Sequence, residues 1–383
     1  MAERISLMNN SINQLTGSPR CPNLLTLNLR WNHLQMISSN FFDFMPALKV
    51  LDLSFNKHLA ELPGNFYELV SLQHLDLSYT GVKELSLELR NLTKLEFLYL
   101  NNIDELEILP QQVVSNLSRL KRLDLFHSGI SDQVVDGNVF SGGNEVLMDE
   151  LLCLPGLQAL SFTVKSEHAL QRFFRSDKLQ KVTYGLDIEL CRGTTTVRLE
   201  SGMRLTWVQI GNCFDLEEVT VDWAGGSETP CHNWNLRTPT CLVHLRRLII
   251  QNCKVLVHLN GLISVPILKF LEIENCKAMK RVIGHGDADG AEIREESWAF
   301  CNLQILKLND LDQLESISRY PLCFASLRAI HVLDCPNLKK LPFHANCARD
   351  KLYSISGQEA WWHRLQWEDT TMKSIFAPYL RKL

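Results

Sequence analysis

The chain has 383 residues, of which 45% are hydrophobic and 21% are charged. This composition is typical of a folded protein with a large apolar core and excludes a disordered, highly charged chain. The formal net charge of -4 argues against nucleic acid or an anionic membrane surface as a partner, and no apolar run is long enough to cross a bilayer.

The amino terminus, Met1–Ile5, has no hydrophobic core of the kind found in secretion signals. Without such a signal, the 12 cysteines are interpreted as reduced thiols of an intracellular protein. We therefore expect a cytoplasmic protein.

One pattern, L-x-x-L-x-L, recurs from the start of the chain. Its first three copies begin at Leu24, Leu48 and Leu72, a constant spacing of 24 residues, and a half-repeat lies upstream over residues 5–15. This is the leucine-rich-repeat signature. Further copies begin near Leu95, Leu120, Leu157, Leu179, Leu205, Leu245, Leu268, Leu303 and Leu327.

Each repeat predicts one short strand followed by a turn. The last two leucines alternate with other residues, which is strand spacing and places them on one buried face. The Asn or Cys that follows, as at Asn32, Asn56 and Cys213, can hydrogen-bond the backbone of the turn. The predicted fold is an α/β leucine-rich-repeat solenoid, a horseshoe with a parallel sheet on its concave face and irregular or short helical convex segments.

The predicted organisation is a solenoid of about 12 repeats over residues 1–342, and an aromatic carboxy-terminal cap over residues 343–383. Gly64–Leu69 and Gln111–Leu117 are expected to form one or two helical turns. Inserts rich in Gly, Asp, Ser and Pro are interpreted as loops at Ser131–Asp149, Asp222–Thr240 and Gly284–Ser297. In the cap, Trp361, Trp362 and Trp367 are expected to cover the open end of the core rather than to dock a partner.

Three segments resemble the leucine-rich-repeat region of plant intracellular nucleotide-binding immune receptors of the coiled-coil class. They are the repeat variant ending in Leu62-Pro63, the run Cys335–Pro342, and the tryptophan-rich run Gly357–Asp369. The opening residues Arg4–Asn10 also resemble the point where that region begins. The chain lacks the phosphate loop and the Met-His-Asp triplet of those receptors. We therefore expect a fragment, a truncated product or a repeat-only relative, without nucleotide binding.

The sequence motifs that could indicate a metal site or a catalytic site are weak. Residues 285–290 lack the ligand spacing of a calcium loop, because an acidic ligand is missing before the glycine and Trp298 stands where a glutamate is required. Cys231, His232, Cys241 and His244 contain no C-x-x-C pair and are not expected to bind zinc. No nucleophile lies in a recognisable catalytic motif. The predictions are no enzyme activity, no cofactor and no metal.

The concave face is the predicted binding surface, because residues beside the strand leucines point outward there. Exposed aromatic and arginine side chains on such a face are typical interface anchors, although Asp between the leucines is also a common filler. The candidate protein-binding residues are Asp52, Asp76, Phe97, Tyr99, Arg122, Asp124, Phe126, Trp207, Arg247, Phe270 and Glu272.

The resemblance implies a protein-recognition module of a plant disease-resistance receptor. Its partners would be a pathogen effector or a guarded host protein, and the nucleotide-binding module of full-length relatives, which the repeats would restrain. Arg30, Trp31, Asp52 and Asp76 would face that module, and the candidate residues from Trp207 onward would face the recognised protein.

Other leucine-rich-repeat functions remain open. The alternative is a stand-alone intracellular leucine-rich-repeat scaffold or a ubiquitin-ligase substrate adaptor. A ubiquitin-ligase substrate adaptor would need a helical docking box upstream, which residues 1–20 are too short to hold. An extracellular receptor domain would need a secretion signal and paired terminal cysteines, and the sequence indicates neither.

Overall fold

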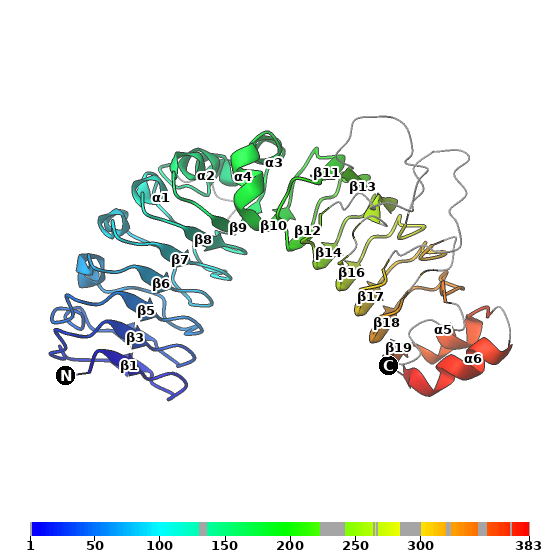
Figure 1. Cartoon of the computed structure of the whole chain (residues 1–383), viewed down its shortest axis with the longest axis horizontal. Helices are drawn as coiled ribbons and strands as arrows, with labels where there is room; N and C mark the ends of the chain where they lie inside the picture. The colour runs from blue at the N-terminus through cyan, green and yellow to red at the C-terminus, as the bar shows by residue number, and fades with distance from the viewer. Residues whose placement is uncertain are drawn as a thin grey trace. The chain divides into compact units, whose positions relative to one another are not determined.

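Short parallel strands form where the L-x-x-L-x-L pattern predicts them (Figure 1). The computed structural model describes residues 2–129, 136–222, 242–262, 265, 267–283, 300–318, 322, 324–343, 351–367 and 370–382. The chain divides into two compact units, Met1–Asp187 and Ile188–Leu383. In each unit the strands form a parallel sheet, which confirms the predicted leucine-rich-repeat fold.

The strands of the first unit pair in parallel in chain order. They are β1 (Arg4–Ser6), β3 (Thr26–Asn28), β5 (Val50–Asp52), β6 (His74–Asp76), β7 (Phe97–Tyr99), β8 (Arg122–Leu125), β9 (Ala159–Val164) and β10 (Thr183–Glu189), the last of which contains the boundary between the units. Leu51 pairs with Leu75 and Leu75 with Leu98, and all three side chains are fully buried. Each repeat thus places one leucine on the next inside a common core, which no single repeat could bury alone.

The turn after each strand is held by the predicted asparagine. Asn56 is buried, and its Nδ2 donates to the carbonyls of Leu53 at 2.8 Å and Leu29 at 3.1 Å. Its Oδ1 accepts from the backbone N–H of Leu34 at 3.1 Å. One side chain therefore satisfies backbone groups of two successive repeats that the turn leaves unpaired.

Opposite the sheet, the first unit carries short segments in place of long helices (Figure 1). The expected helical turns are present as the 3₁₀ helix η1 (Gly64–Glu68) and the helix α1 (Val113–Asn116), and η2 (Leu87–Asn91) lies between them in the chain. Strands β2 (Gln14–Leu15) and β4 (Met36–Ile37) form a separate two-stranded sheet.

The loop expected over Ser131–Asp149 is partly wrong, because helix α2 (Ser141–Cys153) begins within it. Residues 142–144 take left-handed conformations, so the regular helix follows them. Leu147 and Leu151, four residues apart on one helical face, are both buried. The glycines and polar residues at the start of the insert concealed this apolar stripe.

The repeat expected to begin at Leu179 is displaced, because its strand β10 starts only at Thr183. Leu179 lies in helix α4 (Asp177–Val182), which follows helix α3 (Glu167–Phe174). The side chain of Ser176 caps α4 by accepting the backbone N–H of Leu179 at 3.2 Å. The buried Leu186 and Ile188 therefore take the two core positions that the pattern assigned to Val182 and Tyr184.

The strands of the second unit also pair in parallel in chain order. They are β12 (Trp207–Gly211), β14 (Arg247–Gln251), β16 (Phe270–Glu274), β17 (Ile305–Asn309), β18 (Ala329–Leu333), β19 (Ser354–Gly357) and β20 (Leu380–Lys382). A second, three-stranded parallel sheet contains β11 (Thr196–Glu200), β13 (Glu218–Asp222) and β15 (His258–Asn260).

Cysteine replaces asparagine at the turns of the second unit. The Sγ of Cys335 donates to the carbonyls of Leu333 at 3.3 Å and Leu308 at 3.4 Å, which is the bonding pattern of Asn56 made with a weaker donor. Burial raises the pKa of the Cys335 thiol to about 12. The thiol therefore stays protonated and can donate throughout the physiological range of pH.

The carboxy-terminal segment packs a cluster of aromatic rings against the last strands. It contains α5 (Glu359–Arg364), α6 (Thr370–Phe376) and the 3₁₀ helix η4 (Ala377–Tyr379). Trp361 and Trp362 are buried, and the Nε1 of Trp361 donates to the carbonyl of Leu338 at 3.1 Å. Strands β19 and β20 continue the sheet within this same segment, and the division at residue 342 remains a prediction.

Several expected features fall outside the described residues. The loop expected over Asp222–Thr240 lies outside them except for Asp222, which ends β13. The loop expected over Gly284–Ser297 lies wholly outside them, as do Cys231, His232 and Cys241. Within the part of the chain that the structure describes, no helix has the length and apolar character needed to cross a bilayer.

Candidate protein-binding surface

The central outward column of the first unit runs through neighbouring strands in register. Asp52 pairs with Asp76, Asp76 with Tyr99, and Tyr99 with Asp124 along strands β5 to β8. We call the side of each sheet that carries these outward residues the sheet face. The structure thus brings the predicted residues of this column together on adjacent strands.

The aspartates of this column accept hydrogen bonds from the residue two positions further along their own repeat. Asp52 Oδ1 accepts the backbone N–H of Ser54 at 2.9 Å and the Ser54 hydroxyl at 2.6 Å. Asp76 Oδ1 accepts the backbone N–H of Ser78 at 2.9 Å. A short carboxylate bonding two residues ahead stabilises the turn at the strand end. Burial raises the pKa of Asp76, and the hydrogen bonds from Ser78 oppose this shift.

Arg122 organises an aromatic cluster on the sheet face. Its guanidinium carbon lies 5.3 Å from the centroid of the Tyr99 ring and 4.7 Å from that of Tyr184. Its Nη2 donates to the Tyr184 hydroxyl at 2.6 Å and lies 3.1 Å from the buried carboxylate of Asp124. We call Phe97, Tyr99, Arg122, Asp124 and Tyr184 the Arg122 cluster. Its cation is held in place before any partner arrives.

His74 extends the Arg122 cluster toward the amino terminus. Its ring centroid lies 5.1 Å from that of Tyr99 and 5.7 Å from that of Phe97. Burial lowers the pKa of His74, and the charge of Asp52 acts in the opposite direction. At neutral pH this imidazole is therefore uncharged and adds to the aromatic surface.

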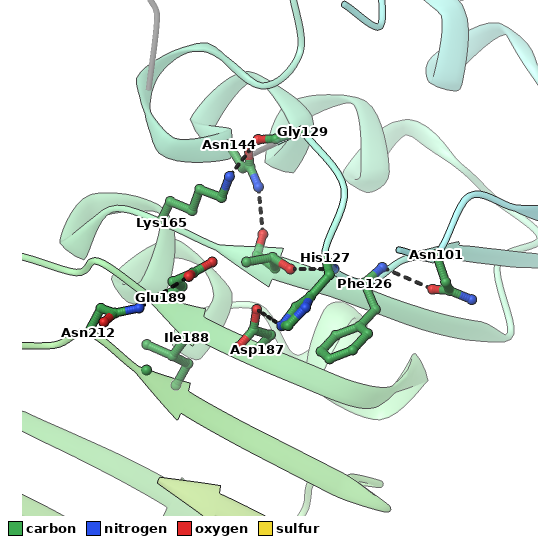
Figure 2. A network of polar contacts seen from close by, with 12 residues as sticks. Asn101, Phe126, His127, Gly129, Asn144, Lys165, Asp187, Ile188, Glu189 and Asn212 are labelled. Atoms are coloured by element: carbon green, nitrogen blue, oxygen red, sulfur yellow. Dashed lines mark hydrogen bonds and ion pairs between the residues drawn. The ribbon is translucent and has the colours of Figure 1, made fainter. Parts of the chain in front are cut away.

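Phe126 and His127 lie just beyond β8, in the network shown in Figure 2. Their rings stack with centroids 4.0 Å apart. The backbone N–H of Phe126 donates to Asn101 Oδ1 at 3.0 Å, and that of His127 donates to the Thr163 hydroxyl at 3.0 Å. These bonds hold the predicted residue Phe126 on a fixed turn.

His127 also faces a buried carboxylate. Its Nε2 lies 3.3 Å from Asp187 Oδ2, and the Asp187 side chain is 1% exposed (Figure 2). Sequence reasoning missed His127, Tyr184 and Asp187 as members of this face. The displaced strand near Leu179 explains two of these omissions, because the wrong register turned Tyr184 into a core position and left Asp187 beyond the strand.

A second aromatic feature lies at the strand ends of the first unit. Trp31, Phe55 and Tyr79 stand two residues after the last leucine of successive repeats, and their rings stack with centroid distances of 4.6 Å and 4.3 Å. Trp31 is 52% exposed and Tyr79 is 44% exposed. All three have positive φ, a conformation uncommon for bulky residues. The resemblance indicated Trp31 here, whereas Phe55 and Tyr79 were missed although they occupy the same repeat position.

In the second unit the predicted residues lie on three adjacent strands. Trp207 pairs with Arg247 and Arg247 pairs with Phe270. The Arg247 guanidinium carbon lies 4.3 Å from the Phe270 ring centroid, and Lys307 Nζ lies 5.4 Å from it. Lys307 also lies 3.5 Å from the carboxylate of Glu272. Sequence reasoning named four of these residues and missed Lys307, since the cation–ring contacts join different repeats.

Family comparisons find leucine-rich repeats along the chain. Residues 226–356 match the leucine-rich repeats described as plant disease resistance protein RPS2-like. Residues 22–82 match the general leucine-rich repeat, and residues 70–111 match its two-copy form.

Curated relatives from Arabidopsis thaliana match nearly the whole chain. A probable disease resistance protein is 34% identical over 383 residues, covering 99% of this chain and 40% of the relative. Disease resistance protein RPS5 is 31% identical over 382 residues, covering 99% of this chain and 41% of the relative. The chain thus spans about two fifths of the length of these relatives.

Among solved structures, the functional domain of InlJ from Listeria monocytogenes is 14% identical with a TM-score of 0.49, covering 93% of this chain and 67% of that one. The two-residue alternation of buried leucines, the asparagine and cysteine turns and the full-length similarity to the Arabidopsis proteins agree with one another. The chain is therefore similar to the leucine-rich-repeat regions of plant disease resistance proteins.

Proposed function

We propose that the chain recognises other proteins through its sheet face, as the sensing part of a plant disease-resistance receptor. The observation that carries this proposal is the Arg122 cluster. Phe97, Tyr99 and Arg122 are each partly exposed on adjacent strands, and Arg122 is already fixed by Asp124 and Tyr184. Aromatic and arginine side chains held rigidly on a surface are the usual anchors of protein interfaces.

The proposed partners follow from the relatives. A pathogen effector or a guarded host protein would bind the sheet face, and the repeats would restrain a nucleotide-binding module in a full-length receptor. The similarity to named disease resistance proteins supports this role. We also propose that the chain works without catalysis in the cytoplasm, where a reducing environment keeps turn thiols such as Cys335 able to donate.

The test is a pairwise binding screen of the purified chain against pathogen effectors and host proteins, followed by titration of each hit. Replacing both Phe97 and Tyr99 by alanine should weaken binding on the order of a hundredfold, because two anchor side chains are removed. The thermal midpoint should change little, because both side chains are only half-buried.

The matched control replaces Phe44 and Phe214, which are 41% and 40% exposed and lie outside the sheet face, by alanine. This control variant should bind like the wild type. The proposed role of the Arg122 cluster is wrong if F97A/Y99A binds every hit normally, or if its melting temperature collapses while binding persists.

A further inference from the structure

In the second unit, basic side chains gather where the strands begin. Arg246, Lys269 and Arg328 each immediately precede a strand of the sheet, and Arg247 is the first residue of β14. All four side chains are exposed. We call these four residues the basic row.

Backbone hydrogen bonds place the members of the basic row at equivalent positions of the sheet, with the neutral Gln304 between Lys269 and Arg328. The N–H of Lys269 donates to the carbonyl of Arg246 at 2.8 Å, and that of Gln304 donates to Lys269 at 2.8 Å. Arg328 donates in turn to Gln304 at 2.8 Å. The cations thus lie at the starts of β14, β16 and β18, three of the four consecutive strands β14, β16, β17 and β18 (Figure 1).

The basic row is not neutralised by the described part of the chain. Among the described residues no carboxylate lies within ion-pair distance of Arg246, Arg247, Lys269 or Arg328. The chain as a whole carries a net charge of -4. Within the described residues, four exposed cations without ion-paired carboxylates therefore form a local field opposite in sign to the net charge of the chain.

The first unit provides the comparison. There Lys121 immediately precedes β8, and its Nζ lies 2.6 Å from Glu96, which precedes the neighbouring strand β7. The next residue, Arg122, is paired with Asp124 at 3.1 Å. At the same repeat positions, therefore, the first unit pairs Lys121 and Arg122 with its own carboxylates, whereas the basic row has no such pair among the described residues.

Phe270 adds an apolar element directly beside the basic row. Its ring lies between two cations, with Arg247 at 4.3 Å and Lys307 at 5.4 Å from the centroid. The ring orients the guanidinium of Arg247, so less side-chain freedom is lost when a carboxylate binds it. The surface thus offers fixed charge next to aromatic area.

The spacing of the basic row suits an extended polypeptide. Neighbouring strands lie about 4.8 Å apart, and an extended chain advances about 3.4 Å per residue. Carboxylates at alternate residues of a segment running across the strands would therefore come near successive members of the row.

We propose that the basic row and Phe270 bind an extended acidic segment of a partner protein, which crosses strands β14 to β18. Its carboxylates pair with Arg246, Arg247, Lys269 and Arg328, and an apolar side chain contacts Phe270. This inference rests on the proposed protein-recognition function and names the chemistry of the recognised partner.

The test uses a fluorescein-labelled peptide with aspartate at alternate positions and phenylalanine and glycine between them. Fluorescence anisotropy with the full chain should show binding that weakens as ionic strength rises from about 0.05 M to about 0.5 M, because salt screens exposed charges. A peptide with asparagine in place of every aspartate should not bind.

Replacing Arg246 and Lys269 by glutamate should weaken peptide binding on the order of tenfold or more, because attraction becomes repulsion. The charge-matched control K280E/K340E reverses two exposed lysines outside the basic row and should bind like the wild type. If R246E/K269E fails to fold, R246Q/R328Q removes the charges without reversing them and should again weaken binding.

Equal loss in the control variant, unchanged binding by R246E/K269E and R246Q/R328Q, or absence of peptide binding at low salt would each overturn the inference. Tighter binding of labelled single-stranded DNA than of the acidic peptide would replace it with nucleic-acid recognition. The proposed function fails separately, because its test depends on Phe97 and Tyr99 in the other unit and on a protein hit.

Discussion

At the scale of single residues, one turn position governs the stacking of repeats. Asn56 is 0% exposed and bonds the backbone of its own repeat and the one before it. In the second unit the single S–H of Cys335 is shared between the two equivalent carbonyls, those of Leu333 and Leu308. The position therefore selects for a compact buried donor rather than for one residue type.

This interpretation predicts the outcome of two substitutions at Asn56. Asn56→Ala should lower the free energy of unfolding by about 1–3 kcal/mol, because backbone groups of two repeats lose their buried partner. Asn56→Cys should lower the free energy of unfolding by less, because its thiol can donate to the same carbonyls. Urea unfolding followed by circular dichroism measures both, with the exposed Asn91→Ala as control. Equal losses for alanine and cysteine would contradict the donor role.

At the scale of elements, we propose that the carboxy-terminal helices complete the core that the last strands would otherwise expose. Trp361 is 2% exposed. Its ring packs so closely on Gly357 that a Cβ added to this glycine would lie 2.7 Å from the Cε3 of Trp361. Trp362 and Trp367 stack edge to face with centroids 5.1 Å apart. Helix α5 thus places large rings over strand β19, as an end repeat of a solenoid requires.

Trp361→Ala should therefore destabilise the second unit by about 3–5 kcal/mol, because the lost ring leaves a cavity and an unpaired Leu338 carbonyl. Hydrogen exchange measured by mass spectrometry should accelerate in β18 and β19 and stay unchanged in β5 of the first unit. Trp361→Phe retains most of the apolar volume, so its destabilisation should lie between that of the wild type and that of Trp361→Ala. Uniform acceleration across both units would show that the effect is not local to the cap.

At the scale of the whole molecule, the two compact units use the same repeat for different surfaces. The first unit presents the Arg122 cluster and the exposed stack of Trp31, Phe55 and Tyr79. The second presents the basic row. The chain spans about two fifths of the length of its relatives. In a receptor as long as those relatives, another part of the protein would be available to contact one of these two surfaces.

On the proposed function, the aromatic stack restrains the nucleotide-binding module. A chimaera in which this chain replaces the repeats of the 34% identical relative should stay silent in leaf tissue. Trp31→Ala with Phe55→Ala should release spontaneous cell death, measured by ion leakage, because stacked contact area is lost. Phe44→Ala, which removes a 41% exposed ring outside the stack, should stay silent. A silent double variant with normal protein levels would remove the stack from the restraint.

The sequence by itself determined the repeat, the strand that each repeat forms, the buried leucines and the bonding role of Asn56. These follow from local spacing, since alternate residues of a strand share a face whatever lies next to it. The prediction from spacing was wrong near Leu179, because the apolar residues that resemble the repeat pattern there lie in helices α3 and α4.

Tertiary structure alone decided which side chains meet. Arg122 reaches Tyr184 across 62 residues of chain, and Arg247 and Lys307 enclose Phe270 from two different strands. It also decided which charges are satisfied, because Lys121 pairs with Glu96 whereas the basic row meets no carboxylate within ion-pair distance in the described part of the chain. Such contacts join separate repeats, so they depend on the stacking of strands and on insert lengths, which the pattern within a single repeat does not encode.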